Sequence, residues 1–280
     1  MLSKKNNMKI KILTAFVLLL WACNKDPEFT TVENGGLAFY NASQLLRVEL
    51  EQKNPLNVQQ PALILLNTTD KNHKPDSAAG ADGKTLPFFA MSTGGQQMFP
   101  MYGFSQVTPP WLTYMRVRSG IQQISFLKTD STLAVKTDVV LDAGENTTVF
   151  LMDSLGEYAT MVLHDDSKPA ANQVQLRMVH TSPDAGELMV KVNGQWLGKD
   201  TLGFRDATGF LSFTMPDSVT STIYRVQVSS KSDTSGFIAK GALIGAKGHS
   251  YTMVMNGYVE SHFDPIYVEA DFRLSFLRNK

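Results

Sequence analysis

The feature that most constrains the fold is a period of two in the hydrophobic pattern. Apolar residues alternate with polar ones at 46–50, 123–126 and 224–228, and glycine, asparagine, aspartate and proline clusters separate such runs. Alternation of this kind is typical of half-buried β-strands, and short intervals between turn signals favour antiparallel sheets in a sandwich. After residue 22 we find no convincing stripe with the helical spacing. The chain is therefore predicted to be all-β.

The chain also repeats itself. Residues 144–152 align with 248–256 at an offset of 104, and 37–43 align with 176–182 at an offset of 139. The offsets differ by 35, so the first copy holds about that many extra residues, which we place at 67–100. We predict two tandem sandwiches at 36–165 and 173–262, joined by a linker at 166–172. Residues 263–280 would then form a strand that closes a sheet edge, a strand donated to another molecule, or a tail.

A family resemblance rests on two motifs in the second copy. Residues 176–186 read LRMVHTSPDAG and residues 190–194 read VKVNG, which resembles the opening of the bacterial domain of unknown function 4397. Residues 141–152 and 244–257 resemble the glycine-then-strand ending of that family. The resemblance covers 172–260 well and 35–160 more loosely, because the first copy lacks the Ser-Pro-Asp turn. It implies immunoglobulin-like β-sandwiches, usually in exported proteins, and no established activity.

The N-terminus has the order of a secretory signal. Four lysines among the first 11 residues precede a nearly unbroken apolar run at 12–22. This run is short for a transmembrane helix, which needs roughly 20 apolar residues and is the weaker interpretation. Leu20, Ala22 and Cys23 resemble the bacterial lipobox, in which the cysteine thiol takes a diacylglycerol. We predict a cleaved signal peptide at 1–22 and lipidation of Cys23, with a plain signal peptide as the alternative.

The residues after Cys23 carry a hint about location. Lys25, Asp26 and Glu28 resemble the lysine-plus-acid export tag of surface lipoproteins in the Bacteroidetes. The alternative is that 23–35 is only a solvated tether. The resemblance implies a protein that is anchored in the outer membrane by its lipid and faces the cell exterior. Several acyl chains would make this attachment effectively permanent.

Composition limits the function classes. Removal of 22 residues from 280 leaves 258, and loss of four lysines from a net charge of zero leaves about −4. Nucleic acid is therefore not an expected partner. Acylation of Cys23, the single cysteine, leaves none for a disulfide or a thiolate-bound metal. The histidines are scattered without a ligand spacing, so we predict no metal and no cofactor.

Two pairs of residues are candidate ligand contacts. Asn193-Gly194 predicts a two-residue hairpin turn that places Lys191 beside Trp196 on the exposed face. Trp196 could stack on a sugar ring or anchor a protein, or it could cover the other sandwich. Trp111 and Tyr114, after two prolines, could form a second aromatic platform, or they could pack in the core.

One group of polar residues is a candidate for hydrolase chemistry. His180 and Asp184 flank the Ser182-Pro183 turn. A hydrolase would need such a nucleophile and base in contact, but turn formation is the simpler role of these residues.

Asp-(Ser/Thr)-apolar or Thr triplets resemble the O-glycosylation sequon of exported Bacteroidetes proteins, although Asp-Ser and Asp-Thr also form turns. These triplets centre on Ser77, Ser131, Ser154, Thr201 and Ser218.

Together these features predict a non-enzymatic outer-membrane lipoprotein that acts as a binding or adhesion module. Its expected partners are the membrane, through the lipid on Cys23, and a glycan or another envelope protein. The alternative is a structural accessory subunit of a cell-envelope assembly, and a hydrolase is the remotest interpretation.

Overall fold

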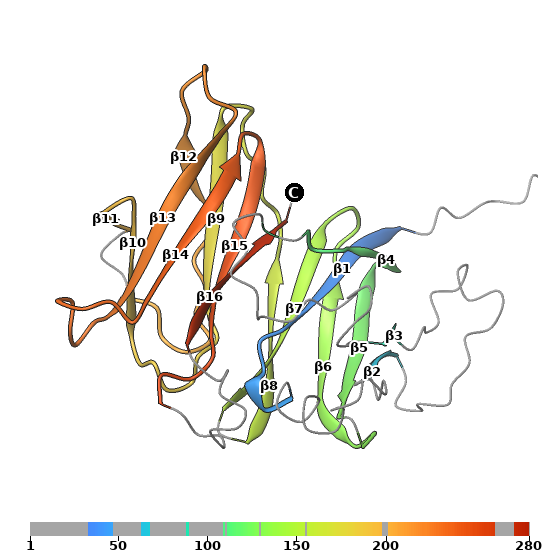
Figure 1. The fold of residues 1–280 in the computed structure, drawn as a ribbon. Helices are drawn as coiled ribbons and strands as arrows, with labels where there is room; N and C mark the ends of the chain where they lie inside the picture. The colour runs from blue at the N-terminus through green and yellow to red at the C-terminus, as the bar shows by residue number, and fades with distance from the viewer. Residues whose placement is uncertain are drawn as a thin grey trace, which may run out of the picture. The chain divides into compact units, whose positions relative to one another are not determined.

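The computed structural model describes residues 33–46, 63–67, 88–89, 109, 111–128, 130–154, 156–197, 201–260 and 272–279. These residues form sixteen strands in four four-stranded sheets, which confirms the predicted all-β fold (Figure 1). None of the described helical residues makes a helix long and apolar enough to cross a membrane. Several predicted site residues lie outside the described ranges: Cys23, Lys25, Asp26, Glu28 and Ser77.

The first sandwich pairs two sheets. One has the order β4-β1-β7-β8, which are Met115–Arg118, Asn34–Asn41, Asn146–Ser154 and Glu157–His164. The other has the order β3-β2-β5-β6, which are Phe88–Phe89, Leu63–Leu66, Gly120–Leu127 and Leu133–Leu141. The strand β3 lies inside the predicted insertion at 67–100 and pairs with β2. This insertion therefore contributes a strand to the sheet.

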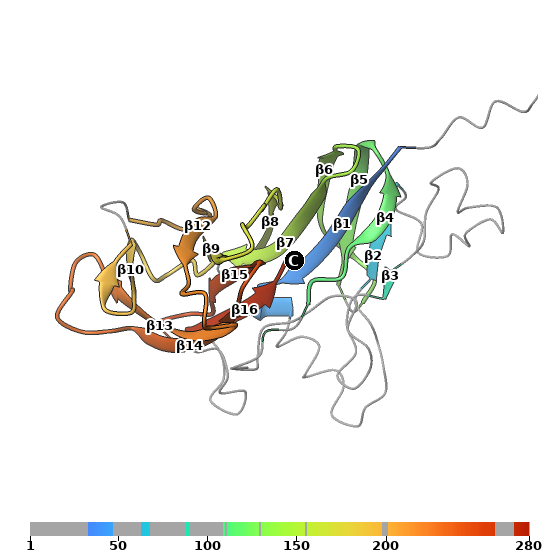
Figure 2. The ribbon, with the colours of Figure 1, turned by 90° about the horizontal axis from the view of Figure 1, so that it is seen from above.

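The second sandwich repeats this order eight strands later. One sheet is β12-β9-β15-β16, which are Leu211–Thr214, Gln173–His180, His249–Asn256 and Arg273–Arg278. The other is β11-β10-β13-β14, which are Gln195–Trp196, Leu188–Val192, Ser221–Ser230 and Ala239–Ala246, and Figure 2 shows β13 and β14 side by side. The C-terminal strand β16 pairs antiparallel with β15.

The registers match as well as the order. Leu37 of β1 lies opposite Thr147 of β7 in a parallel pair, and Leu176 of β9 lies opposite Tyr251 of β15 in the same way. The offsets of 139 and 104 read from the sequence predict this correspondence. The turns before β7 and β15 each contain a glycine with a positive φ, 77° at Gly144 and 73° at Gly248. Such φ values favour glycine.

Helix replaces strand at one predicted position. Leu46 begins the alternating run at 46–50, yet 44–46 form a helical turn, and 47–50 lie outside the described residues. The Leu46 amide donates to Ser43 Oγ at 3.1 Å, which is the geometry of a helix N-cap. Local capping by Ser43 therefore overrides the period-two signal here.

We call β4-β1-β7-β8 and β12-β9-β15-β16 the inner sheets and the other two the outer sheets. Strands β1, β7 and β15 are buried along nearly their whole length, whereas β13 alternates between exposed and buried residues. Each sandwich has its own core between an inner and an outer sheet. In the first core the rings of Phe39 and Phe126 meet edge to face, with centroids 5.9 Å apart.

A third apolar cluster explains why the inner sheets are buried on both faces. It joins side chains of both sandwiches, among them Tyr40 and Phe150 from the first and Val179, Val254 and Leu277 from the second. The two inner sheets therefore pack against each other. Strands covered on two faces need continuous apolar runs, which is why 37–40 does not alternate.

A buried carboxylate lies at this interface. Asp165 forms an ion pair with Arg177, and both side chains are almost fully buried. Asp165 also accepts hydrogen bonds from Tyr114 Oη at 2.7 Å, from Asn279 Nδ2 at 3.3 Å and from the hydroxyl of Thr148. Ser167, in the predicted linker at 166–172, is buried as well, so part of this linker lies in the interior.

A second buried carboxylate lies elsewhere in the interface. Asp153 accepts hydrogen bonds from Ser43 Oγ at 2.5 Å and from the phenol of Tyr258, which belongs to the second sandwich. Asn256 Nδ2 donates to Tyr40 Oη at 2.9 Å, again across the interface. These hydrogen bonds are directional, so they fix one relative register of the two inner sheets.

Candidate functional site: the β10–β11 hairpin

The predicted hairpin is present with the predicted register. Asn193 and Gly194 have φ of 50° and 82°, the positive values that a tight hairpin turn needs. Lys191 pairs with Trp196 and Val192 with Gln195, and Leu197 N donates to Val190 O at 2.9 Å. Asn193 Oδ1 accepts from Arg225 N at 2.9 Å, which ties the turn to β13.

The outer side of this hairpin carries an aromatic and cationic group of residues. Lys191 Nζ lies 4.1 Å from the centroid of the Trp196 ring and 5.6 Å from that of Phe237. Lys240 Nζ lies 4.9 Å from the Phe237 centroid. Trp196 and Phe237 are each 36% exposed. We call Lys191, Trp196, Phe237 and Lys240 the aromatic–lysine face.

Neither lysine of this face has a carboxylate within ion-pair distance among the described residues. Each ammonium is instead held over a π-face, a contact worth about 0.5–1 kcal/mol at an exposed site. The aromatic–lysine face therefore offers a ligand apolar ring surface and two ammonium groups that pair with no carboxylate of the described residues.

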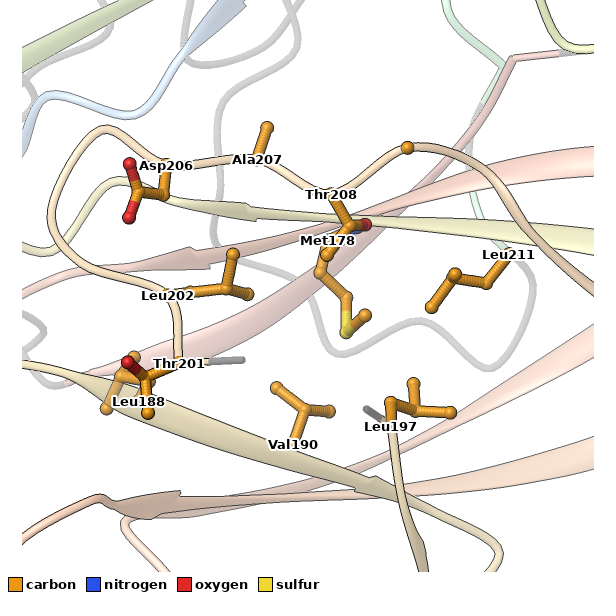
Figure 3. A pocket seen from close by; sticks show the side chains of 11 residues that line it. Met178, Leu188, Val190, Leu197, Thr201, Leu202, Asp206, Ala207, Thr208 and Leu211 are labelled. Atoms are coloured by element: carbon orange, nitrogen blue, oxygen red, sulfur yellow. The ribbon is translucent and has the colours of Figure 1, made fainter. Parts of the chain in front are cut away.

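The inner side of the same hairpin lines a pocket of about 420 Å³ (Figure 3). Leu188, Val190 and Leu197 form one wall, and Figure 3 shows Met178 and Leu211 opposite them. The connection at 201–209 crosses from one sheet to the other, since Leu202 bridges to Leu188 and Ala207 to Val179. The volume falls within the usual range of ligand pockets, roughly 300–1,000 Å³.

Polar groups of the pocket are held by local bonds. Thr201 Oγ1 donates to Glu187 Oε1 at 2.8 Å, and Asp206 Oδ2 accepts from Gly203 N at 2.8 Å. Hydrogen bonds from Lys231 and then from Thr201 lower the pKa of Glu187. The lining is otherwise mostly apolar, so this pocket suits an apolar group better than ordered water.

The second predicted aromatic pair does not form a platform. Trp111 is 55% exposed, and the guanidinium of Arg278 lies 3.8 Å from its ring centroid. Tyr114 instead directs its hydroxyl to buried Asp165. Burial, and then the charge of Asp165, raise the pKa of Tyr114 far above its usual value. Tyr114 is therefore bonded to a buried carboxylate, whereas Trp111 is exposed.

The candidate hydrolase residues are held by backbone and turn contacts. His180 Nε2 donates to Gly186 O at 2.9 Å, and His180 Nδ1 accepts from Ser182 N at 3.2 Å. Ser182 Oγ donates to Asp184, whose oxygens accept from the amides of Val259 and Glu260. Burial lowers the pKa of His180. His180 therefore holds no contact to the Ser182 hydroxyl of the kind that activates a nucleophile.

Three of the four described O-glycosylation candidates lie at turns or strand ends. Ser131 has a φ of 68° in the turn before β6, Ser154 ends β7, and Ser218 is exposed in a turn before β13. Thr201 lines the pocket. Modification at these positions stays a prediction.

One cluster was not predicted from sequence. Asp142, Glu145 and His164 are exposed, and one ligand atom of each lies within 4.8 Å of the others. His164 stands 19 positions from Glu145, so no local spacing signals the group. Only the antiparallel pairing of β7 with β8, which places His164 opposite Thr147, brings it beside the turn at 142–145.

Comparisons with known proteins support a limited assignment. A domain of unknown function, DUF4397, is found at residues 87–191. The match starts just before β3 and ends within β10, so it differs from the expected boundaries at 35–160 and 172–260. No curated protein matches the chain.

A solved structure of a candidate cell adhesion protein from Bacteroides fragilis is weakly similar. It shares 9% identity over 80% of this chain and 85% of that chain, with a TM-score of 0.17. At that TM-score the similarity shows neither a shared fold nor a shared function.

Proposed function

We propose that the protein is a non-enzymatic, lipid-anchored surface module that binds a glycan or an envelope protein through the aromatic–lysine face. The observation that carries this proposal is an exposed indole on a rigid two-residue hairpin, with an ammonium 4.1 Å from its ring centroid. Aromatic rings stack on the apolar faces of sugars, and lysines add hydrogen bonds or charge.

The anchor is part of the same proposal. Cys23 would carry the lipid, and Lys25, Asp26 and Glu28 would direct the chain to the outer face of the outer membrane. The strand β1 begins at Asn34, so few residues separate the proposed lipid from the first sandwich. A binding face presented this way would meet ligands outside the cell.

A tandem arrangement of two DUF4397 domains is also proposed. The matched strand order and register of the two sandwiches support it, because independent folds would rarely share both. The second copy would then carry the binding hairpin, in which Asn193-Gly194 makes a two-residue loop between β10 and β11.

A glycan array probed with the purified protein tests the binding role. The Trp196→Ala variant should lose at least tenfold in affinity for any glycan that the parent binds. Ile223→Ala is the matched control, because Ile223 is 51% exposed on β13 of the same outer sheet. Absence of glycan binding, or equal binding by Trp196→Ala, would exclude sugar stacking on this face.

A second role is supported by a different observation. Ile121 and Val140 are 72% and 55% exposed and lie directly opposite each other on β5 and β6. Exposed apolar pairs on a sheet face favour docking to another protein, as in a structural accessory subunit. If this pair docks to another protein, Ile121→Lys should release the chain from a detergent-extracted envelope complex. Size-exclusion chromatography would then detect a smaller species. Trp196→Ala should leave the complex intact.

A further inference from the structure

A group of three possible metal ligands lies at one end of the first sandwich, far in sequence from the hairpin. We propose that Asp142, Glu145 and His164 form a binding site for a divalent transition-metal ion such as Zn²⁺. Their ligand atoms all lie within 4.8 Å of one another. The site combines an imidazole from the end of β8 with two carboxylates from the β6–β7 turn.

The backbone at these residues is fixed by the neighbouring strand. Gly144 N donates to Asn34 O at 2.9 Å, and Gly36 N donates to Glu145 O at 2.7 Å. The turn is therefore held against β1. His164 lies opposite Thr147, and its Nδ1 is 3.4 Å from Thr147 Oγ1. A contact at Nδ1 leaves Nε2 available as the metal ligand, with the hydroxyl orienting the ring.

The second sandwich provides an internal comparison. By the shared register, Ala246, His249 and Arg278 occupy the positions equivalent to Asp142, Glu145 and His164. There, Arg278 Nη2 lies 2.8 Å from His249 Nδ1 and 2.5 Å from His249 Nε2. In one copy a guanidinium therefore occupies the space beside the turn. In the other copy the same space is bordered by two carboxylates and an imidazole.

No described lysine or arginine pairs with the two carboxylates of this site. Two like charges close together repel each other, and a bound cation would remove that repulsion. The turn itself does not need these side chains, because the equivalent turn in the second sandwich has alanine and histidine. A bound cation would thus occupy in the first copy the space that the Arg278 guanidinium occupies in the second.

The donor set selects the kind of metal. Ca²⁺ and Mg²⁺ take oxygen ligands, whereas an imidazole beside carboxylates suits Zn²⁺, Co²⁺ or Ni²⁺. Bonds to these ions are about 2.0–2.2 Å long. The three side chains are exposed, so small rotations can bring their atoms to that distance. Three protein ligands would leave at least one position for water or for an acidic group of a partner.

Titration of the purified Cys23→Ser protein with Co²⁺ and Zn²⁺ tests the site, and the substitution removes the one thiol ligand. We expect one ion per chain, visible Co²⁺ absorption bands, displacement of Co²⁺ by Zn²⁺, and a higher melting temperature with metal. Ca²⁺ should give neither stoichiometric binding nor a shift. His164→Gln and Asp142→Asn should each weaken binding at least tenfold.

His249→Gln is the matched control, because it removes a histidine from the equivalent turn of the second sandwich, at the position that corresponds to Glu145. It should bind metal as the parent does. The inference is overturned if the parent binds no metal at micromolar concentration, or if His164→Gln and Asp142→Asn bind as tightly as the parent. Far-ultraviolet circular dichroism of each variant confirms that a lost signal is not lost folding.

Discussion

Replacement of Arg177 by methionine should weaken the interface between the two sandwiches. Arg177 is the cationic partner of buried Asp165, and its guanidinium also donates to Thr252 Oγ1 at 3.0 Å and to His164 O at 3.0 Å. Methionine fills similar volume but leaves the carboxylate without a positive charge. Removing one partner of a buried ion pair costs about 3–5 kcal/mol.

The structure places the expected value at the low end of that range. Asp165 keeps three neutral donors, from Tyr114, Thr148 and Asn279, each worth about 1 kcal/mol. We therefore expect a loss of about 3 kcal/mol, which is more than a hundredfold in the folding equilibrium. With a urea dependence of about 3 kcal/mol per molar, the unfolding midpoint should fall by about 1 M.

Urea unfolding followed by far-ultraviolet circular dichroism measures this loss. Lys231→Met is the matched control, because Lys231 forms an exposed ion pair with Glu187 and should barely move the midpoint. Adding Asp165→Leu to Arg177→Met should restore much of the stability, since it removes the unpaired charge. A midpoint for Arg177→Met within error of Lys231→Met would refute the assigned role of this ion pair.

Three further predictions concern buried groups. Because the folded-state pKa of Tyr114 is raised above 10, its contribution to stability is complete below that pH and is lost as the pH rises above it. Tyr114→Phe should therefore show a smaller fall in stability above pH 10 in alkaline-unfolding curves. Because burial lowers the pKa of His180 below 6.5, stability should fall as the pH drops below that value, and His180→Asn should flatten the fall in acid-unfolding curves. Gly245→Ala would place Cβ 2.8 Å from the buried Tyr224 ring and 3.0 Å from Val174 Cγ1, so thermal unfolding should show a loss of about 1–3 kcal/mol.

Local signals were sufficient for much of the fold. Asn193-Gly194 identified the hairpin and its register, because only a short left-handed turn joins strands so closely. The repeats at Gly144 and Gly248 identified equivalent strands, because each copy starts its central strand after the same turn. Alternation predicted that Lys191 points away from the core, and the register of the turn then placed Trp196 beside it.

Contacts between distant segments were not predictable. The role of Asp165, directly before the predicted linker at 166–172, could not be read from the sequence, because a short polar run has the same composition whether its carboxylate faces water or a buried arginine. Tyr114 could not be separated from Trp111 without knowing that Asp165 lies nearby. His164 joined Asp142 and Glu145 through strand pairing, which no spacing rule for metal ligands describes.

The parallel pairing of β1 with β7 has a mechanical consequence. The strand β1 follows the proposed lipid tether and pairs with β7 from Gly36 to Asn41 while β4 pairs along part of its other edge. A load between the membrane and a ligand held at Trp196 would pull β1 lengthwise. Its interstrand bonds would then bear the force together, in shear, instead of opening one after another. A sandwich attached in this way should keep hold of its target under flow that would peel apart a terminal hairpin.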